Sequence, residues 1–363
     1  MYNEHYYCVI MAGGIGSRFW PISREAKPKQ FLDFVQIGKS FLRLTYDRVS
    51  RFIRKENIIV VSLTRYKDLV MQHLPELDER NLLLEPYNRN TASVLTFAAY
   101  TLLGRDPLAV MMATPADLAI DNTDEFARTM TKALDWAAGH DDLITIGITP
   151  TRPDSNFGYI QVSDGFTGDA PSKVKTFTEK PDVDLARVFI ESGEFLWNSG
   201  MFAWRASAIR DELERYAPEI TNLWKGWKEA LDTPAQEEFL HKVYGDTLRI
   251  SIDYAVMEKT DNAMVYPASF LWADIGNWDS LYEYLAHHDA KGNASNVEGK
   301  SLILDSRDNI IYSDNRGKLT AIRGMDSFIV IDTDDVLLIC PRNDDKFKDF
   351  LSQLAMPEFA EYK

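Results

Sequence analysis

The sequence predicts an α/β fold: a mainly parallel sheet covered by helices on both faces, followed by a small C-terminal β domain. Up to about residue 150, short continuous apolar runs alternate with longer amphipathic stretches. Such runs are typical of buried parallel strands, and the stretches between them are typical of connecting helices. After Gly299, short β-type segments follow one another at close spacing with polar turns between them, which is typical of a small β layer or roll.

Apolar runs mark the expected strands of the first region. They are Tyr6 to Met11, Ile58 to Ser62, Leu82 to Leu84, Leu108 to Thr114 and Leu143 to Ile148. The helical patterns between them include Thr91 to Leu103 and Asp124 to Ala138. Right-handed crossovers place the carboxyl ends of such strands on one edge of the sheet, where open α/β sheets bind ligands. We therefore expect the chemistry just after these strands.

The region from about residue 151 to 290 mixes strands with helices and continues the same domain. Its expected strands are Gly158 to Val162, Met201 to Trp204 and Met264 to Tyr266. The later β segments, expected to form a meander, are Ser301 to Leu304, Asn309 to Tyr312, Lys318 to Ile322, Phe328 to Ile331 and Val336 to Ile339. The change of pattern between Asp289 and Gly299 predicts two domains, 1–290 and 291–363.

Composition excludes several classes of protein. The 363 residues are 45% hydrophobic and 26% charged, which suits a globular chain with a full core. Forty Lys and Arg against 55 Asp and Glu give a net charge of −15, which argues against a nucleic-acid binder but not against a small phosphorylated ligand. Cys8 and Cys340 lie in apolar runs and indicate a reducing cytoplasm. No apolar stretch approaches membrane-spanning length.

A glycine-rich turn follows the first predicted strand and is followed in turn by Arg18 and by Pro28-Lys29. Glycines bring bare N–H groups against an anion, and an arginine binds phosphate through a planar fork of donors. A plain turn is the alternative, but the two cations favour a phosphate site. The dinucleotide fingerprint is excluded because Phe19 stands where its third glycine belongs. Gly38-Lys39-Ser40 resembles the end of a nucleoside-triphosphate P-loop, but Asp33 stands where the first glycine of that motif belongs.

The motif Gly13-Gly14-Ile15-Gly16-Ser17-Arg18, followed by Pro28-Lys29-Gln30-Phe31-Leu32, resembles the signature of sugar-nucleotidyltransferases. Within them it is most similar to the mannose-1-phosphate guanylyltransferases, also called GDP-mannose pyrophosphorylases, and the resemblance spans residues 6 to about 285. It implies a Rossmann-like catalytic domain. Ser17 replaces the family's usual threonine and keeps the hydroxyl. The nucleotide-binding residues implied for this loop are Ala12, Gly13, Gly14, Gly16 and Ser17.

A second motif, Leu84 to Ala92, joins the third strand to a helix. Guanine presents an N1–H and an exocyclic amino group side by side, and a carboxylate accepts from both. From the residues alone, Glu85 as a solvated strand end and Asn90 as a helix N-cap is the favoured interpretation. The resemblance implies instead that Glu85 faces guanine, with Asn90 and Thr91 beside it.

Two aspartates, Asp117 and Asp274, each follow a short apolar run at a predicted strand end. Taken singly, such a residue is more often a turn residue. Carboxylates far apart in sequence can still meet around one hard divalent cation, and magnesium prefers oxygen ligands. The resemblance implies that Asp117 and Asp274 hold Mg²⁺. Leu118 replaces the histidine that commonly follows the first acid.

Further motifs point to a sugar phosphate. Gly158 allows close approach to a sugar ring, Glu179 accepts from neighbouring hydroxyls and Lys180 suits the phosphate. If each motif stood alone, the preferred interpretation would be an exposed turn at Glu179-Lys180 and a β-bulge at Asn198. The family's order of motifs implies a sugar site with Tyr159 and Asn198 as further members.

The segment Ser251 to Glu258 also matches the family, and its helix is expected beneath the sugar pocket. We interpret Asp253 as a first-turn acid that favours the helix dipole rather than as a site residue. No histidine lies in a nucleophile or metal spacing, and no Ser/His/Asp or Cys/His set stands out. Such an absence suits phosphoryl-type transfer, which needs no nucleophile from the enzyme.

The resemblance implies the reaction GTP + α-D-mannose 1-phosphate = GDP-mannose + diphosphate, by in-line attack of the sugar phosphate on the α-phosphorus. Arg18 and Lys29 are expected to hold the triphosphate, Mg²⁺ on Asp117 and Asp274 to bridge phosphate oxygens, and Lys180 to deliver the sugar phosphate. The five residues form the predicted catalytic set. The terminal β segments are expected to cover one end of the catalytic domain and to offer a surface for a homodimer.

Two other functions stay open from the sequence. One is the same chemistry on another hexose 1-phosphate, because Glu179 and Asn198 suit several epimers, while Glu85 argues against pyrimidine nucleotides. The other is a non-catalytic regulatory homologue that binds GDP-mannose. Loss of a catalytic cation or metal acid would indicate it, and the sequence keeps all of them.

Overall fold

The computed structural model describes residues 3–14, 16–34, 37–163, 166, 168, 170–285, 288–342, 344, 346–354 and 356–362. Ile15 of the glycine motif lies outside them. Two compact units interleave along the chain. Unit 1 comprises Met1–Gly13, Leu42–Ala116 and Ile120–Trp272, and unit 2 comprises Gly14–Phe41, Asp117–Ala119 and Ala273–Lys363. The predicted domain boundary at residue 290 stays a prediction.

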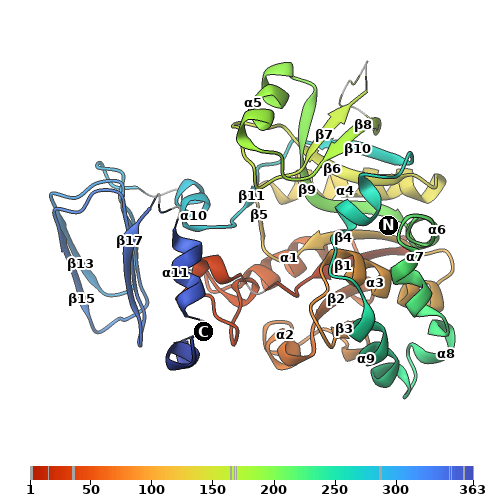
Figure 1. The fold of residues 1–363 in the computed structure, drawn as a ribbon, viewed down its shortest axis with the longest axis horizontal. Helices are drawn as coiled ribbons and strands as arrows, with labels where there is room; N and C mark the ends of the chain where they lie inside the picture. Colours follow the sequence, from red (N-terminus) through yellow and green to blue (C-terminus); the bar gives the residue numbers. More distant parts are fainter. Residues whose placement is uncertain are drawn as a thin grey trace. The chain divides into compact units, whose positions relative to one another are not determined.

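Unit 1 is built on a large mixed sheet (Figure 1). Its strands are β1 (Tyr6–Met11), β2 (Ile58–Leu63), β3 (Leu82–Glu85), β4 (Val110–Pro115), β6 (Leu143–Ile148), β7 (Tyr159–Val162), β8 (Ser172–Thr178), β9 (Phe195–Arg205) and β10 (Ala263–Ala268). Among the described residues they form one nine-stranded sheet in the order β3-β2-β1-β4-β9-β6-β10-β8-β7.

Parallel pairing joins β1 to β2 and β4, β2 to β3, and β6 to β10. The predicted α/β fold class is therefore confirmed, but the sheet is mixed, because β8 pairs antiparallel with β10 and β7. The long strand β9 also runs antiparallel to the strands it pairs with, β4, β6 and β7. The sequence indicated only its apolar second half, since the first half carries the polar residues Asn198 and Ser199.

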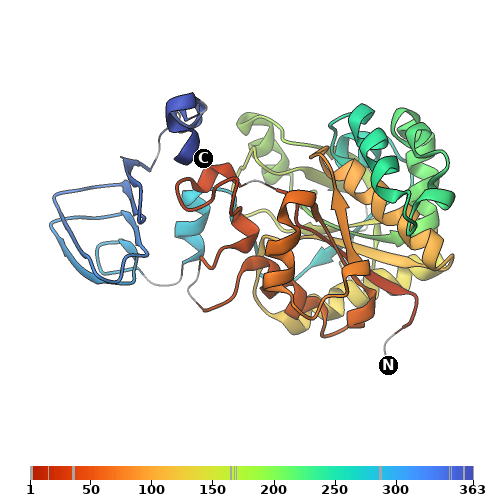
Figure 2. The same ribbon diagram turned by 90° about the horizontal axis from the view of Figure 1, so that it is seen from below.

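The helices of the same unit cover both faces of the sheet, with Phe41 at the start of α1 belonging to unit 2. They are α1 (Phe41–Val49), α2 (Lys67–His73), α3 (Thr91–Arg105), α4 (Thr123–Gly139), α5 (Val183–Ser192), α6 (Ala206–Tyr216), α7 (Pro218–Thr221), α8 (Trp227–Ala230) and α9 (Gln236–Asp246). α3 and α6 share one face, and α4 lies on the other side (Figure 2). On that side, Phe126 of α4 packs on Phe52 with ring centroids 5.9 Å apart. Arg48 of α1 lies over the Phe126 ring.

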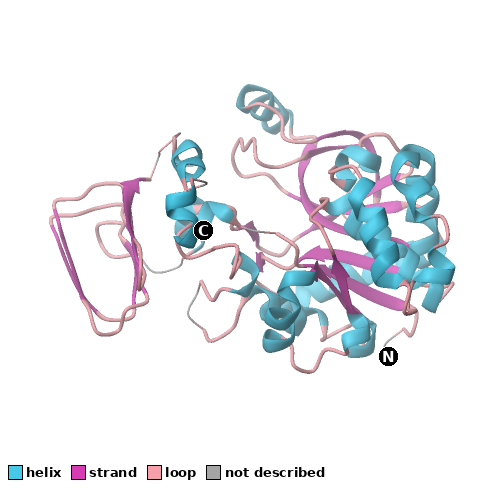
Figure 3. Ribbon diagram, turned by 60° about the horizontal axis from the view of Figure 1, so that its bottom comes forward, coloured by secondary structure: helices cyan, strands magenta, loops and turns pink. Residues whose placement is uncertain are grey.

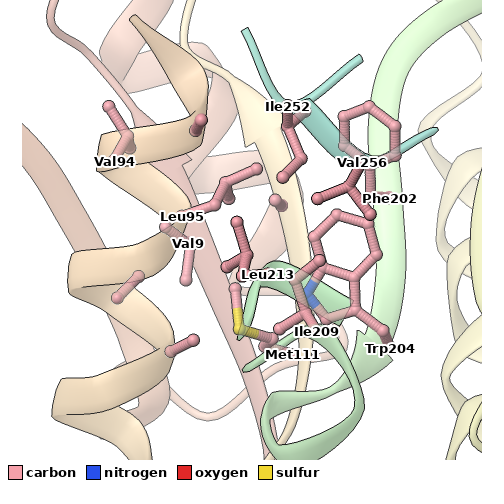
Figure 4. Packing of buried hydrophobic residues seen from close by; sticks show 14 of the residues in the cluster. Val9, Val94, Leu95, Met111, Phe202, Trp204, Ile209, Leu213, Ile252 and Val256 are labelled. Atoms are coloured by element: carbon pink, nitrogen blue, oxygen red, sulfur yellow. The ribbon is translucent and has the colours of Figure 1, made fainter. Parts of the chain in front are cut away.

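The core of this unit lies between the sheet and the α3–α6 layer (Figure 4). Each strand contributes the side chains of one of its faces to this core, because successive side chains of a strand point to opposite sides of the sheet. Examples are Val9 on β1, Met111 on β4 and Trp204 on β9. Leu95 of α3 and Ile209 of α6 close over them. Each fully buried side chain of this size contributes about 1.5–3 kcal/mol. This packing fixes the strand ends at which the predicted site residues lie.

Local sequence signals explain where the helices begin. Asn90 precedes α3 with φ 71° and accepts a hydrogen bond from the Thr91 N–H at 2.8 Å. Asn122 caps α4 by accepting from the Glu125 N–H at 3.2 Å. Asn is favoured at N-caps and tolerates a positive φ. The predicted helices over 91–103 and 124–138 are confirmed.

Unit 2 contains the C-terminal β segments. Its elements are β12 (Ala294–Val297), β13 (Lys300–Leu304), β14 (Ile310–Ser313), β15 (Leu319–Arg323), β16 (Phe328–Asp332) and β17 (Leu337–Pro341), with the helices α10 (Trp278–Tyr284) and α11 (Phe347–Gln353). β5 (Leu118–Ile120) pairs with β11 (Trp272–Asp274) as a separate two-stranded sheet. The strands are drawn in magenta in Figure 3.

The predicted β-rich C-terminal region is confirmed, but the predicted meander is wrong. β14 pairs in parallel with β12 and β16, and β13 pairs in parallel with β15. Each segment from β12 to β16 therefore pairs with the next but one, as in a coil of successive turns, whereas β16 and β17 pair antiparallel. The buried Asn309 stabilises this coil, because its Nδ2 donates to Asn293 Oδ1 at 2.8 Å and its Oδ1 accepts from Phe328 N at 2.9 Å.

In the ranges that the structure describes, no helix combines the length and the apolar character that spanning a bilayer requires.

Candidate active site

The second half of the glycine turn lies in unit 2. Gly16 has φ 64°, and a Cβ atom there would lie 2.6 Å from the Lys29 Cβ. Glycine is therefore required both by the backbone conformation and by the close approach of Lys29. Gln30 Nε2 donates to the Gly14 carbonyl at 2.9 Å and ties the turn to the Lys29 segment. Arg18 follows at the surface, with its side chain exposed.

Lys29 lies at the centre of a charged cluster in unit 2. Its side chain is nearly buried, and its Nζ donates to Asp117 Oδ2 at 2.9 Å and lies 3.7 Å from Asp274 Oδ1. The ammonium also lies 5.8 Å from the Phe19 ring centroid and 5.6 Å from that of Phe41. A buried ammonium is costly unless it is paired, and here two carboxylates share it. Three members of the predicted catalytic set are thus brought together.

Asp274 lies near charges of both signs in this cluster. Burial raises the pKa of Asp274, and the neighbouring Asp117 carboxylate raises it further, while Lys29 and Arg18 act against the shift. Arg18 Nη1 lies 3.8 Å from the position that a Gly276 Cβ would take.

The donor set fits a divalent metal ion. Asp117 and Asp274 offer carboxylate oxygens, the hard ligands that such ions prefer, and Lys29 shows that the pair already attracts a cation. Among the described residues, no group of three or more His, Cys, Asp or Glu forms a complete metal site. An ion held by these two aspartates would therefore leave positions for phosphate oxygens and water.

The predicted base-binding residues lie in unit 1, at the carboxyl end of β3. Glu85 is the last residue of this strand and is only 2% exposed, so it is not a solvated strand end. Its Oε1 makes no hydrogen bond to any described residue, and a Cβ on Gly13 would lie 3.3 Å from its Oε2. Burial raises the pKa of Glu85 to about 8, and the Tyr244 hydroxyl only partly opposes this. Glu85 is therefore a buried acceptor short of donors.

The loop after Glu85 is held by an asparagine that the sequence analysis did not single out. Asn88 Nδ2 donates to the Gly13 carbonyl at 3.0 Å, and its Oδ1 accepts from the Asn90 N–H at 3.3 Å. Thr91 Oγ1 accepts from the Ile252 N–H at 2.9 Å. Asn90 and Thr91 thus have internal partners, and their expected contacts with a nucleotide stay predictions. The position of Asn88 between Glu85 and Asn90 was the only feature of the sequence that could have pointed to this role.

The predicted sugar-binding residues come together in unit 1. A Cβ on Gly158 would lie 2.4 Å from Glu179 Oε2 and 3.2 Å from the Asn198 Cβ, so both side chains flank this glycine. Lys180 Nζ donates to Glu179 Oε1 at 2.6 Å, while Glu179 Oε2 is buried without a partner among the described residues. Tyr159 is fully buried, and its hydroxyl accepts from the Asp154 N–H at 3.0 Å.

Asp253 has a partner that the sequence analysis did not indicate. It begins a π-helical turn, Asp253–Met257, but its carboxylate does more than favour the dipole of that turn. Oδ1 accepts from Asn198 Nδ2 at 2.9 Å, across 55 residues of chain. Burial first, and then the charge of Glu179, raise the pKa of Asp253 to about 7. The pairing is long-range, so no local pattern could indicate it.

Comparisons with known proteins show which family this chain resembles. The sequence matches the Nucleotidyl transferase family over residues 7–291 and a MannoseP isomerase/GMP-like beta-helix domain over residues 299–352. The mannose-1-phosphate guanylyltransferase of Klebsiella pneumoniae is 36% identical over 98% of this chain and 76% of its own length. The mannose-1-phosphate guanylyltransferase RfbM of Salmonella typhimurium is 37% identical over 92% of this chain and 69% of its own length.

A solved structure matches along almost the whole chain. It is a Thermus thermophilus protein described as a mannose-1-phosphate geranyltransferase, with a TM-score of 0.85 and 27% identity. The match covers 97% of this chain and all of that one. On the family match, the curated relatives and the shared fold, this chain belongs to the nucleotidyl transferase family.

Proposed function

We propose that this protein is a mannose-1-phosphate guanylyltransferase, which converts GTP and α-D-mannose 1-phosphate to GDP-mannose and diphosphate. Relatives of that name, alike over nearly the whole chain, support the proposal. The observation from the geometry that carries it is the meeting of Asp117 and Asp274 at the Lys29 ammonium. A transfer between two polyanions needs such a charge cluster.

In unit 1, Glu85 would select the base. Its carboxylate is buried, and its Oε1 has no donor among the described residues, whereas guanine offers the N1–H and the exocyclic amino group as two adjacent donors. Pairing with both would satisfy the carboxylate and favour its charged form. Adenine, uracil and thymine do not present two such donors together, so this site would discriminate strongly against their nucleotides.

In the same unit, Glu179 and Lys180 would bind the sugar phosphate. Glu179 keeps one buried oxygen without a partner among the described residues, and it can accept from a sugar hydroxyl. Lys180 is a compact cation whose side chain is more than half exposed. It can leave Glu179 for the incoming phosphate, because such a lysine is flexible.

The chemical step would need no enzyme nucleophile. A phosphate oxygen of mannose 1-phosphate attacks the α-phosphorus of GTP, and a new P–O bond forms. The bond from the α-phosphorus to the bridging oxygen breaks, and the electron pair leaves with diphosphate. Arg18 and Lys29, in unit 2, would neutralise the charge that spreads onto this leaving group.

A divalent metal ion is typical of the family, and we propose that it is Mg²⁺. Asp117 and Asp274 would hold it through their carboxylate oxygens. When bound there, it would supply positive charge against the phosphate oxygens. The expected cytoplasmic location and homodimer stay predictions; Cys8 and Cys340 are free thiols, as a reducing compartment would leave them.

Diphosphate release tests the proposal. Purified protein is assayed with GTP, ATP, UTP or dTTP against mannose 1-phosphate, glucose 1-phosphate and other hexose 1-phosphates, with and without Mg²⁺. The expected result is release only with metal, with GTP at least a hundredfold better than the other nucleotides, and with mannose 1-phosphate as the best sugar. A better rate with a pyrimidine nucleotide, or no release with any pair, would overturn the proposal.

A further inference from the structure

Asn198, expected to meet a sugar hydroxyl, is held by three neighbours in unit 1. Its Oδ1 accepts from the Thr145 hydroxyl at 3.0 Å and from the Gly200 N–H at 3.2 Å. Its Nδ2 donates to Asp253 Oδ1 at 2.9 Å. The backbone N–H of Gly200 can only donate, so it identifies which amide atom is the oxygen.

This arrangement decides what Asn198 offers to a ligand. An amide oxygen has two lone pairs, and both are engaged. The amide nitrogen has two hydrogens, of which Asp253 takes one. Asn198 therefore presents one N–H that is not bonded to any described residue, and the bond to Asp253 fixes the direction of that N–H.

Glu179 complements this donor, because it lies beside Asn198 at Gly158. Its buried Oε2 lies 2.4 Å from the position of a Gly158 Cβ, and the Asn198 Cβ lies 3.2 Å from the same position. Oε2 has no partner among the described residues and is an acceptor. A sugar hydroxyl both donates and accepts, so a donor edge and an acceptor edge that flank one glycine suit such a ligand.

The segment that carries Asp253 is itself well anchored. The Ile252 N–H donates to Thr91 Oγ1 at 2.9 Å, and the Ile250 carbonyl accepts from the Ala92 N–H at 3.3 Å. Asp253 then begins a single π-helical turn, a rare feature that is frequent at functional sites. The carboxylate is thus fixed from the start of α3, and it can act as a rigid reference for Asn198.

We propose that Asp253 is a positioning residue of the sugar pocket, which orients the Asn198 amide so that its free N–H donates to one hydroxyl of the sugar 1-phosphate. This inference rests on the proposed function, because that function supplies the sugar phosphate. Asp253 acts through Asn198 and does not touch the reacting atoms. It contributes to recognition of the sugar rather than to the transfer step.

Two substitutions separate the acceptor from the charge. Asp253→Asn keeps an oxygen that can accept from Asn198, and it resembles a carboxyl group that burial has brought close to its neutral form. Asp253→Leu fills a similar volume without any acceptor. We expect Asp253→Asn to keep kcat/KM for mannose 1-phosphate within about threefold. Asp253→Leu should raise the KM for mannose 1-phosphate at least tenfold, with the KM for GTP within twofold and kcat within threefold.

Deoxy sugars give a sharper readout. The 2-, 3- and 4-deoxy analogues of mannose 1-phosphate are compared with the parent in wild type and in Asp253→Leu. In wild type, the analogue that lacks the hydroxyl bound by Asn198 should lose at least tenfold in kcat/KM. In Asp253→Leu that penalty should fall to about twofold, while the other two penalties stay unchanged, because the lost contact cannot be lost twice.

A matched control comes from a buried carboxylate outside the pocket. Glu212 Oε1 accepts from Asn262 Nδ2 at 2.9 Å, as Asp253 does from Asn198. Glu212→Leu should lower Tm without changing the KM for either substrate. If Asp253→Leu fails to fold, Thr145→Val removes the other side-chain contact of the Asn198 amide and should raise the KM for mannose 1-phosphate in the same selective way, by about threefold or more.

Several outcomes would overturn the inference. They are an unchanged KM for mannose 1-phosphate in Asp253→Leu, an equal rise in both KM values, or deoxy penalties that all shrink together. If wild type releases no diphosphate, the proposed function fails, and calorimetric titration of wild type and Asp253→Leu with mannose 1-phosphate then decides the inference alone. Equal affinity, or no binding by wild type, would end it.

Discussion

Asp117 and Asp274 of unit 2 have a different kind of partner from Glu85 and Asp253 of unit 1. In unit 2, Asp117 and Asp274 share the buried Lys29 ammonium at 2.9 and 3.7 Å. In unit 1, Glu85 has a buried oxygen without a described partner, and Asp253 meets an amide rather than a cation. Charge paired with charge suits a reaction between polyanions, whereas an acceptor kept short of donors suits the recognition of a ligand that brings them. Substitutions in unit 2 should therefore lower kcat, and those in unit 1 should change KM and specificity.

The largest effect is expected in the charge cluster. Asp117→Ala removes the hydrogen-bonding partner of Lys29 and one of the two carboxylates expected to hold the metal. Loss of such a contact costs about 3 kcal/mol or more in the transition state, so kcat should fall at least a hundredfold. Steady-state diphosphate release measures kcat, and circular dichroism checks the fold. A wild-type kcat in a folded variant would contradict the division between the two units.

Glu85→Gln should cost nearly as much, but through specificity. The carboxylate can accept two donors from guanine, whereas the amide keeps one acceptor oxygen and adds a donor of its own. We expect kcat/KM for GTP to fall about a hundredfold. Inosine triphosphate lacks the exocyclic amino group and is the control substrate. Wild type should prefer GTP to inosine triphosphate at least tenfold. In Glu85→Gln the preference for GTP over inosine triphosphate should be less than threefold. An unchanged preference would show that Glu85 does not contact the base.

Gly158→Ala should have a smaller effect, confined to the sugar. The new Cβ would lie 2.4 Å from Glu179 Oε2, so this carboxylate must move. We expect the KM for mannose 1-phosphate to rise about tenfold, with the KM for GTP unchanged. Gly104→Ala is the matched control, because a Cβ there lies 3.5 Å from a Trp227 ring atom, an ordinary contact. Equal effects on both KM values would mean that Gly158 serves the fold rather than the pocket.

The sequence revealed the elements of the fold better than their pairing. Continuous apolar runs located the parallel strands because burial on both faces leaves no alternation. The C-terminal segments could not be assigned to a coil, because short β segments show their length but not their neighbours. The contact of β14 with β12 and β16 depends on partners such as Asn293 and Asn309 from successive turns.

The candidate site shows the same limit. Motifs located Asp117 and Asp274 individually, but only the folded chain shows that they meet at Lys29. The sequence indicated for Asp253 only a local role in a helical first turn, because its bond to Asn198 is long-range. Local patterns identify residues with chemical potential; the partner that decides their role comes from tertiary structure.

The smallest predicted effect concerns stability, and it tests whether Glu85 is really short of donors. Burial raises its pKa from the ordinary 4.5 to about 8. The folded protein thus holds a proton that the unfolded chain releases near pH 4.5. The contribution of Glu85 to the free energy of unfolding is therefore fully present below that pH and is lost as the pH rises towards 8.

Glu85→Gln carries no such proton. The Tm of wild type minus that of Glu85→Gln should therefore fall by a few degrees between pH 5 and pH 9, measured by calorimetry without nucleotide. Asp253 titrates in both proteins and cancels in this difference. Parallel Tm curves would show that Glu85 ionises freely in the folded protein, and the contrast between the two units would then be lost at this residue.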